Sequence, residues 1–166
     1  MGIFGSKAAK DTKEIPPICD IDITRYLGTW YEIARLPHAF EKGLDNVTAA
    51  YTLKSDGKIE VINTGFKNGE KKIAKGVAWI PDKSCPGKLL VSFFRPFKSL
   101  YKIIKLDEEN YSYAVVTSSI KDYLWILSRE PKISDELFNN LISYASSLGF
   151  DASKIIRVSQ DSNYLS

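Results

Sequence analysis

The stretch Tyr26-Leu27-Gly28-Thr29-Trp30-Tyr31-Glu32-Ile33-Ala34 decides the fold, together with a partner stretch near the other end of the chain. That partner is Tyr123-Leu124-Trp125-Ile126-Leu127-Ser128-Arg129. Both are rich in aromatic and β-branched residues, which favour strands. Gly28 allows a tight turn into the first strand. Trp30 supplies a large apolar side chain, and we expect Arg129 to lie across its indole face as a cation–π partner.

Between these two stretches, turn signals recur about every ten residues, the spacing of an all-β chain built from short antiparallel strands. Eight antiparallel strands in sequence order can close into an up-and-down barrel wide enough for one small ligand. The sequence therefore predicts an all-β protein with strands at Thr29–Leu36, Val47–Leu53, Lys58–Phe66, Lys72–Ile80, Lys88–Phe94, Tyr101–Leu106, Ser112–Ser118 and Tyr123–Ser128.

After the last of these strands the hydrophobic period changes to that of a helix. Ser134 is a good N-cap, and acidic residues follow it in the first turn, where they suit the helix dipole. Gly149 is placed to end the helix, and Lys154–Val158 can add a short last strand. One face of the expected helix is apolar, with Leu137, Leu141, Ala145 and Leu148 in helical spacing.

The motif Gly28-X-Trp30, with Arg129 after the last strand, resembles the signature of the lipocalins. The sequence around these motifs is most similar to that of bacterial lipocalins of the outer-membrane lipoprotein type, and also to those of apolipoprotein D and plant temperature-induced lipocalins. The resemblance covers roughly Asp20 to Ser159. It implies an eight-stranded barrel with one C-terminal helix packed on its flank. It also implies a structural role for Gly28, Trp30 and Arg129 at the closed end.

Alternation along the strands predicts which side chains point into the barrel. The resemblance singles out Tyr51, Asn63, Tyr101 and Trp125, which match pocket positions of proteins like apolipoprotein D. An apolar tunnel lined by a few polar side-chain groups suits a fatty acyl chain. In an arbitrary barrel, by contrast, the same side chains would fill a solid core. The expected ligand-binding residues are Ala49, Tyr51, Val61, Asn63, Ala78, Val91, Phe93, Tyr101, Ile103, Val116, Tyr123 and Trp125.

These features favour non-catalytic binding, transport or storage of fatty acids or lysophospholipids close to a membrane. Two alternatives stay open: a carrier of a sterol, retinoid or haem, and a structural envelope lipoprotein. The single histidine, His38, has no recognisable nucleophile partner, and no metal-binding spacing or phosphate-binding loop is present, so we expect neither an enzyme nor a cofactor. A net charge of +3 without a dense basic stripe also argues against nucleic acid.

The ends and loops leave several questions open. We expect a flexible leader at 1–18 and a lipocalin domain at 19–166. The leader lacks the apolar core of a signal peptide, although the resemblance implies the cell envelope or outer membrane. The alternatives are a cytoplasmic form and a myristoyl anchor, since Met1–Ser6 resembles an N-myristoylation signal. The pairing of Cys19 with Cys85 is undecided. Phe40 and Phe94–Phe97 suit a membrane contact or a homodimer.

Overall fold

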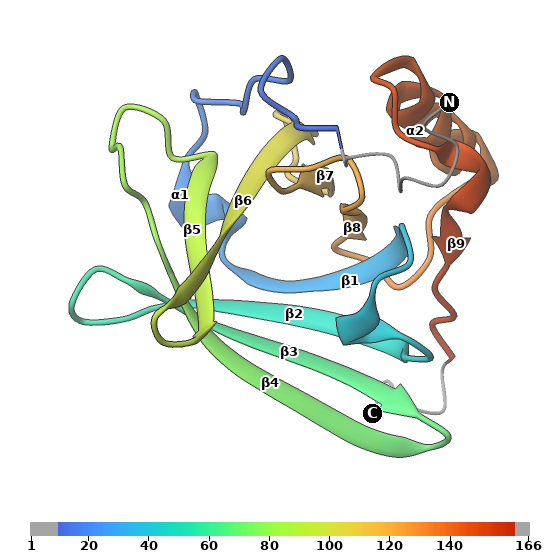
Figure 1. Ribbon diagram of the computed structural model, residues 1–166, viewed down its shortest axis with the longest axis horizontal. Helices are drawn as coiled ribbons and strands as arrows, with labels where there is room; N and C mark the ends of the chain where they lie inside the picture. The colour runs from blue at the N-terminus through green and yellow to red at the C-terminus, as the bar shows by residue number, and fades with distance from the viewer. Residues whose placement is uncertain (1–9, 162–166) are drawn as a thin grey trace, which may run out of the picture.

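Strands β1 to β8 close into an antiparallel barrel in the computed structural model, which describes residues 10–161 (Figure 1). Each strand pairs with the next, and β1 closes the barrel by pairing with both β2 and β8. The all-β fold and its up-and-down order are therefore confirmed. The strands are β1 (Gly28–Arg35), β2 (Asp45–Leu53), β3 (Ile59–Lys67), β4 (Glu70–Trp79), β5 (Lys88–Phe94), β6 (Phe97–Leu106), β7 (Tyr113–Thr117) and β8 (Leu124–Ser128).

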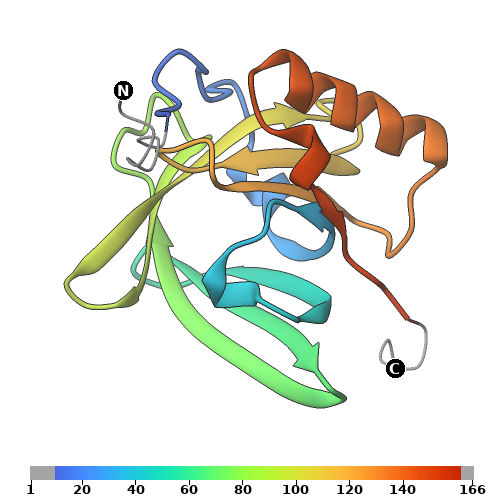
Figure 2. The ribbon, with the colours of Figure 1, turned by 45° about the vertical axis from the view of Figure 1, so that its right-hand side comes forward.

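One long helix, α2 (Asp135–Ser147), packs on the flank of the barrel, as the apolar face predicted (Figure 2). The Ser134 hydroxyl accepts a hydrogen bond from the Leu137 N–H at 3.1 Å, and Gly149 follows the helix with a φ of +90°. Leu141 and Ala145 are buried against the outer side chains of the barrel wall. The Tyr144 hydroxyl donates to the Ile104 carbonyl at 3.0 Å, which ties α2 to β6.

The remaining elements are short. Helix α1 (Ile23–Tyr26) begins after Asp22, whose carboxylate caps it by accepting from the Thr24 N–H. The sequence did not predict this helix, because four residues are too few for a periodic signal. The 3-10 turns η1 (Ala39–Glu41) and η2 (Ala152–Lys154) were also not predicted. Strand β9 (Ile156–Arg157) lies where a last short strand was expected, and pairs with β1.

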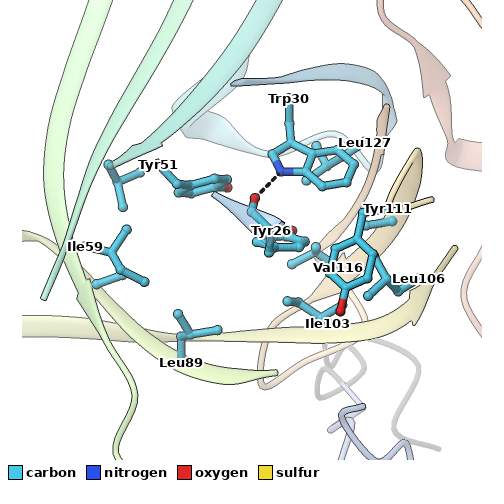
Figure 3. Packing of buried hydrophobic residues seen from close by; sticks show 13 residues of the cluster. Tyr26, Trp30, Tyr51, Ile59, Leu89, Ile103, Leu106, Tyr111, Val116 and Leu127 are labelled. Carbon is cyan, nitrogen blue, oxygen red and sulfur yellow. Dashed lines mark hydrogen bonds between the residues drawn. The ribbon is translucent and has the colours of Figure 1, made fainter. Parts of the chain in front are cut away.

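The closed end of the barrel is filled around Trp30, which is fully buried (Figure 3). Its indole N–H donates to the Tyr26 carbonyl at 2.8 Å, so α1 is held beneath the barrel. The Arg129 guanidinium lies 3.9 Å from the centre of an indole ring of Trp30. Gly28 has a φ of +99°, and a Cβ there would lie 3.3 Å from Arg129 Nη1. The structure thus brings together the three signature residues.

The segment before the barrel differs from the expected flexible leader. Asp11 forms a bridge with Ile120, Thr12 is fully buried, and Ile15 joins the core beneath α2. The two buried side chains, Thr12 and Ile15, and the hydrogen bond from the Thr12 N–H to the Ser119 carbonyl fix this segment to the barrel. The contacts of residues 10–18 thus differ from those expected of a flexible leader, while residues 1–9, which include Met1–Ser6, lie outside the described part of the chain.

Cys19 and Cys85 form a disulfide, which resolves the pairing that the sequence left open. The bond joins the segment before α1 to the turn before β5. Beside it, the Ile18 N–H donates to the Ile103 carbonyl at 2.8 Å. No helix within residues 10–161 is long and apolar enough to cross a membrane.

Candidate ligand cavity

A cavity of about 130 Å³ lies inside the barrel. Its wall is formed mainly by side chains from β2, β3 and β5, with α1 contributing at the closed end. Ten of the twelve expected ligand-binding residues line it, so the period-2 alternation placed them on the correct face of their strands. These ten are Ala49, Tyr51, Val61, Asn63, Ala78, Val91, Phe93, Tyr101, Val116 and Trp125.

The two other expected residues lie outside the cavity lining. Ile103 is fully buried in the core cluster around Trp30, where the closed end of the barrel is packed solid. Tyr123 precedes β8, so no strand pairing fixes its orientation. Its ring stacks on Trp125 with centroids 5.9 Å apart and meets His38 edge-on. Tyr123 therefore packs against the cavity residue Trp125 and does not itself line the cavity.

Three tyrosines place their hydroxyls together in the cavity. The Tyr101 hydroxyl lies 2.6 Å from that of Tyr26 and 2.9 Å from that of Tyr51. Burial raises the pKa of all three hydroxyls, so they stay neutral. Two hydrogen bonds use two of the three hydroxyl protons, which leaves one O–H able to donate to a ligand. Tyr26 was not among the expected residues, because it comes from the unpredicted helix α1.

A buried polar cluster on the wall was also missed. Glu32 of β1 and Glu41 of η1 both line the cavity. The Trp125 indole N–H donates to Glu41 Oε1 at 2.9 Å, and His38 Nε2 lies 2.9 Å from the same oxygen. Arg35 Nη1 lies 3.7 Å from a carboxylate oxygen of each glutamate. The sequence did carry a signal that Glu32 points inward. Glu32 follows Trp30 by two residues on one strand, and residues two apart on a strand share a face.

The two glutamates carry different charges at neutral pH. Burial raises the pKa of Glu32 well above its ordinary value, and the facing Glu41 carboxylate raises it further. For Glu41, burial is outweighed by hydrogen bonds from Glu32, His38 and Trp125, which lower its pKa to about 2. The protonated Glu32 therefore donates to an ionised Glu41. The wall presents a negative group to the cavity, balanced by Arg35 behind it.

We expect Glu32→Gln to stabilise the protein as the pH rises above 5. The folded chain holds a proton on Glu32 that the unfolded chain releases above pH 4.5, so wild-type stability falls with rising pH. The cost is about 1.4 kcal/mol for each pH unit between the two pKa values. Glutamine keeps a donor for Glu41 without titrating. Urea unfolding at pH 5 to 8 measures the difference between the two proteins.

The control is Glu108→Gln, at an exposed position in the turn after β6. Its stability should follow that of the wild type at every pH. A Glu32→Gln variant whose stability also runs parallel to the wild type between pH 5 and 8 would contradict a protonated Glu32.

The cavity lining contains neither a thiol nor a cluster of metal-binding side chains. Both cysteines are bonded to each other, so neither offers a thiol. Within residues 10–161 no group of three or more histidine, cysteine or acidic side chains could hold a metal ion. His38 is held by Glu41 and does not line the cavity. What the site offers is an apolar tunnel with a hydroxyl cluster and an acidic wall.

Comparisons with known proteins agree with this geometry. A family model described as a lipocalin-like domain matches residues 21–160. The outer membrane lipoprotein Blc of Vibrio cholerae is 43% identical over 150 residues, covering 89% of this chain and 88% of that protein. The Blc protein of Escherichia coli K12 is 48% identical over 143 residues, covering 85% and 80%. None of these relatives carries the name of an enzyme.

Solved structures give the same result. Insecticyanin from the tobacco hornworm Manduca sexta superposes with a TM-score of 0.75 and is 25% identical, covering 94% of this chain and 89% of that one. Apolipoprotein D and a temperature-induced lipocalin are also relatives, as the two motifs predicted. The family model covers most of the chain, and the barrel, the flanking helix and the Trp30–Arg129 stack are all present. The chain belongs to the lipocalin family.

Proposed function

We propose that this protein binds, carries or stores a fatty acid or a lysophospholipid in its barrel cavity, without catalysing a reaction. The lining of the cavity carries the proposal. A cavity of about 130 Å³ is close to the size of an engineered apolar cavity that takes benzene, about 150 Å³, so it has room for an apolar group. The aliphatic and aromatic walls suit methylene groups, and the tyrosine hydroxyls suit a polar atom.

Three further features support a site of action at the cell envelope. The Vibrio and Escherichia relatives are named as outer membrane lipoproteins. Disulfides persist in oxidising compartments, which include the bacterial periplasm. Phe40, Phe94 and Phe97 are 84%, 75% and 75% exposed. Exposed aromatic side chains of this kind suit a membrane surface or a second copy of the chain.

We expect a brominated fatty acid to quench the fluorescence of Trp125 selectively. Of the three tryptophans only Trp125 lines the cavity, since Trp30 is buried below it and Trp79 points outward. Trp79→Phe removes the outward emitter and should leave the quenching intact. Adding Trp125→Phe should remove most of the quenching and leave the emission of Trp30. Native mass spectrometry of the delipidated protein, re-exposed to lipid, counts the bound molecules.

The same fatty acid without bromine serves as the control, because it binds without quenching by a heavy atom. The proposal fails in two cases: the delipidated protein retains no single-chain lipid, or quenching is undiminished when Trp125 is phenylalanine.

A further inference from the structure

The barrel wall is incompletely paired between β4 and β5. Strand β3 pairs with β4 along its whole length, from Ile59↔Ala78 to Lys67↔Glu70. Strand β5 pairs with only three residues of β4, the last being Val77 opposite Ser92. Residues 70–76 of β4 therefore have no ladder partner in β5. The hairpin of β3 and β4 diverges from that of β5 and β6 in both views (Figures 1 and 2).

A groove opens on the outer face at the point where the two strands separate. Its volume is about 240 Å³. Phe93 lines both this groove and the inner cavity. Its ring lies against the backbone of β4, because Gly76 has no side chain: a Cβ there would lie 2.8 Å from Phe93 Cδ1 and 2.7 Å from the Ser92 carbonyl oxygen. One aromatic ring thus separates the cavity from the groove.

The groove and the cavity have opposite electrostatic character. Lys75 and Arg95 line the groove, are exposed, and form no ion pair with any residue of the described range. Ser92 adds a hydroxyl, and Glu60 is the one acid in the groove lining. Inside the cavity, the Glu41 carboxylate faces the ligand space. The two cations outnumber Glu60, so the groove attracts an anionic group.

We propose that this groove is a second subsite, which binds the anionic head group, a phosphate or a carboxylate, of an amphiphile whose chain occupies the cavity. The ligand passes between β4 and β5 at Phe93, and its head group pairs with Lys75 and Arg95. Arg95 can bind two oxygens of one head group at once, and Lys75 supplies a second positive charge. The inference rests on the proposed lipid binding, and it assigns the head group to the side wall of the barrel.

The test compares two lipids with the same chain. Oleoyl lysophosphatidate carries a phosphate, and monooleoylglycerol carries none. We expect the wild type to bind the phosphate-bearing lipid roughly tenfold more tightly, the effect of one charge-assisted contact. In Lys75→Gln/Arg95→Gln the two dissociation constants should become equal, with monooleoylglycerol unaffected. The ³¹P resonance of the bound lysophosphatidate should shift between the wild type and this variant.

A matched control removes the same charge from the same hairpins. Lys71 of β4 and Lys98 of β6 are exposed and do not line the groove, so Lys71→Gln/Lys98→Gln should keep the tenfold preference. Loss of the preference in the control, or its survival in Lys75→Gln/Arg95→Gln, would overturn the inference and leave lipid binding intact. Equal binding of both lipids by the wild type would do the same.

Two further outcomes have distinct meanings. If neither lipid binds to the wild type, the proposed function fails, and the subsite fails with it. Inorganic phosphate, added alone as a competitor, should displace lysophosphatidate only weakly, because it lacks the chain. If it competes as tightly as the lipid binds, the groove is a site for free phosphate, and the head-group assignment is wrong.

Discussion

Trp30→Ala should lower the free energy of unfolding by about 3–5 kcal/mol, the usual cost of removing a large buried aromatic side chain. The indole is fully buried, its N–H is bonded to the Tyr26 carbonyl, and its face is covered by Arg129. Removing it leaves a void at the closed end and an unpaired carbonyl on α1. Urea unfolding followed by circular dichroism measures the loss.

Arg129→Ala should cost less than Trp30→Ala, because it removes a partly exposed group. Its guanidinium donates to the Arg25 carbonyl at 2.7 Å, to the Thr29 carbonyl at 3.0 Å and to the Tyr111 carbonyl at 3.3 Å. Arg129→Lys keeps the charge but cannot reach all three acceptors. A double-mutant cycle with Trp30→Ala isolates the stacking energy. A coupling energy of zero between the two substitutions would contradict a cation–π contribution to stability. Trp79→Ala, on the outer face, is the control for loss of an indole.

Breaking the disulfide should destabilise the protein by about 4 kcal/mol, because the bond closes a loop between residues 66 positions apart. In the unfolded chain this link removes conformational freedom that the reduced chain regains. The buried N-terminal segment, which includes Thr12 and Ile15, should lose protection at the same time. Urea unfolding with and without reductant, together with hydrogen exchange, measures both effects.

The Cys19→Ser/Cys85→Ser variant is the control for reduction. It should match the reduced wild type in stability, and reductant should not change it further. A loss below about 1 kcal/mol, well under the range for native disulfides, would show that the contacts of the N-terminal segment alone hold the structure.

Local sequence information determined the elements of the barrel. Lys88–Phe94 was predicted with the bounds of β5, since alternating side chains between turn residues define a strand without reference to any neighbour. The helix was predicted from Ser134 and its apolar stripe for the same reason. By contrast, β6 begins at Phe97, four residues before the expected start, because the turn at Arg95–Pro96 closes a longer hairpin.

The candidate site was partly predictable because alternation says which face of a strand a residue occupies. It does not say what that residue meets across the barrel. Glu41 lies in the short 3-10 turn η1, and its partner Trp125 is 84 positions away. The tyrosine cluster joins α1, β2 and β6. Its hydroxyls meet only because the closed barrel brings these three elements to the same place.

The sequence by itself therefore determined the strands, their order, the flanking helix and the pairing of Trp30 with Arg129. The strands and the helix follow from the hydrophobic period and the turn residues. The pairing follows from the motif formed by Gly28, Trp30 and Arg129, which indicates one arrangement at the closed end of the barrel. Only the tertiary structure decided that Cys19 bonds to Cys85, that residues 10–18 are fixed to the barrel, and that β4 parts from β5 beside Phe93. Each of these depends on distances between segments far apart in the chain, which closure of the barrel sets and local pattern does not encode.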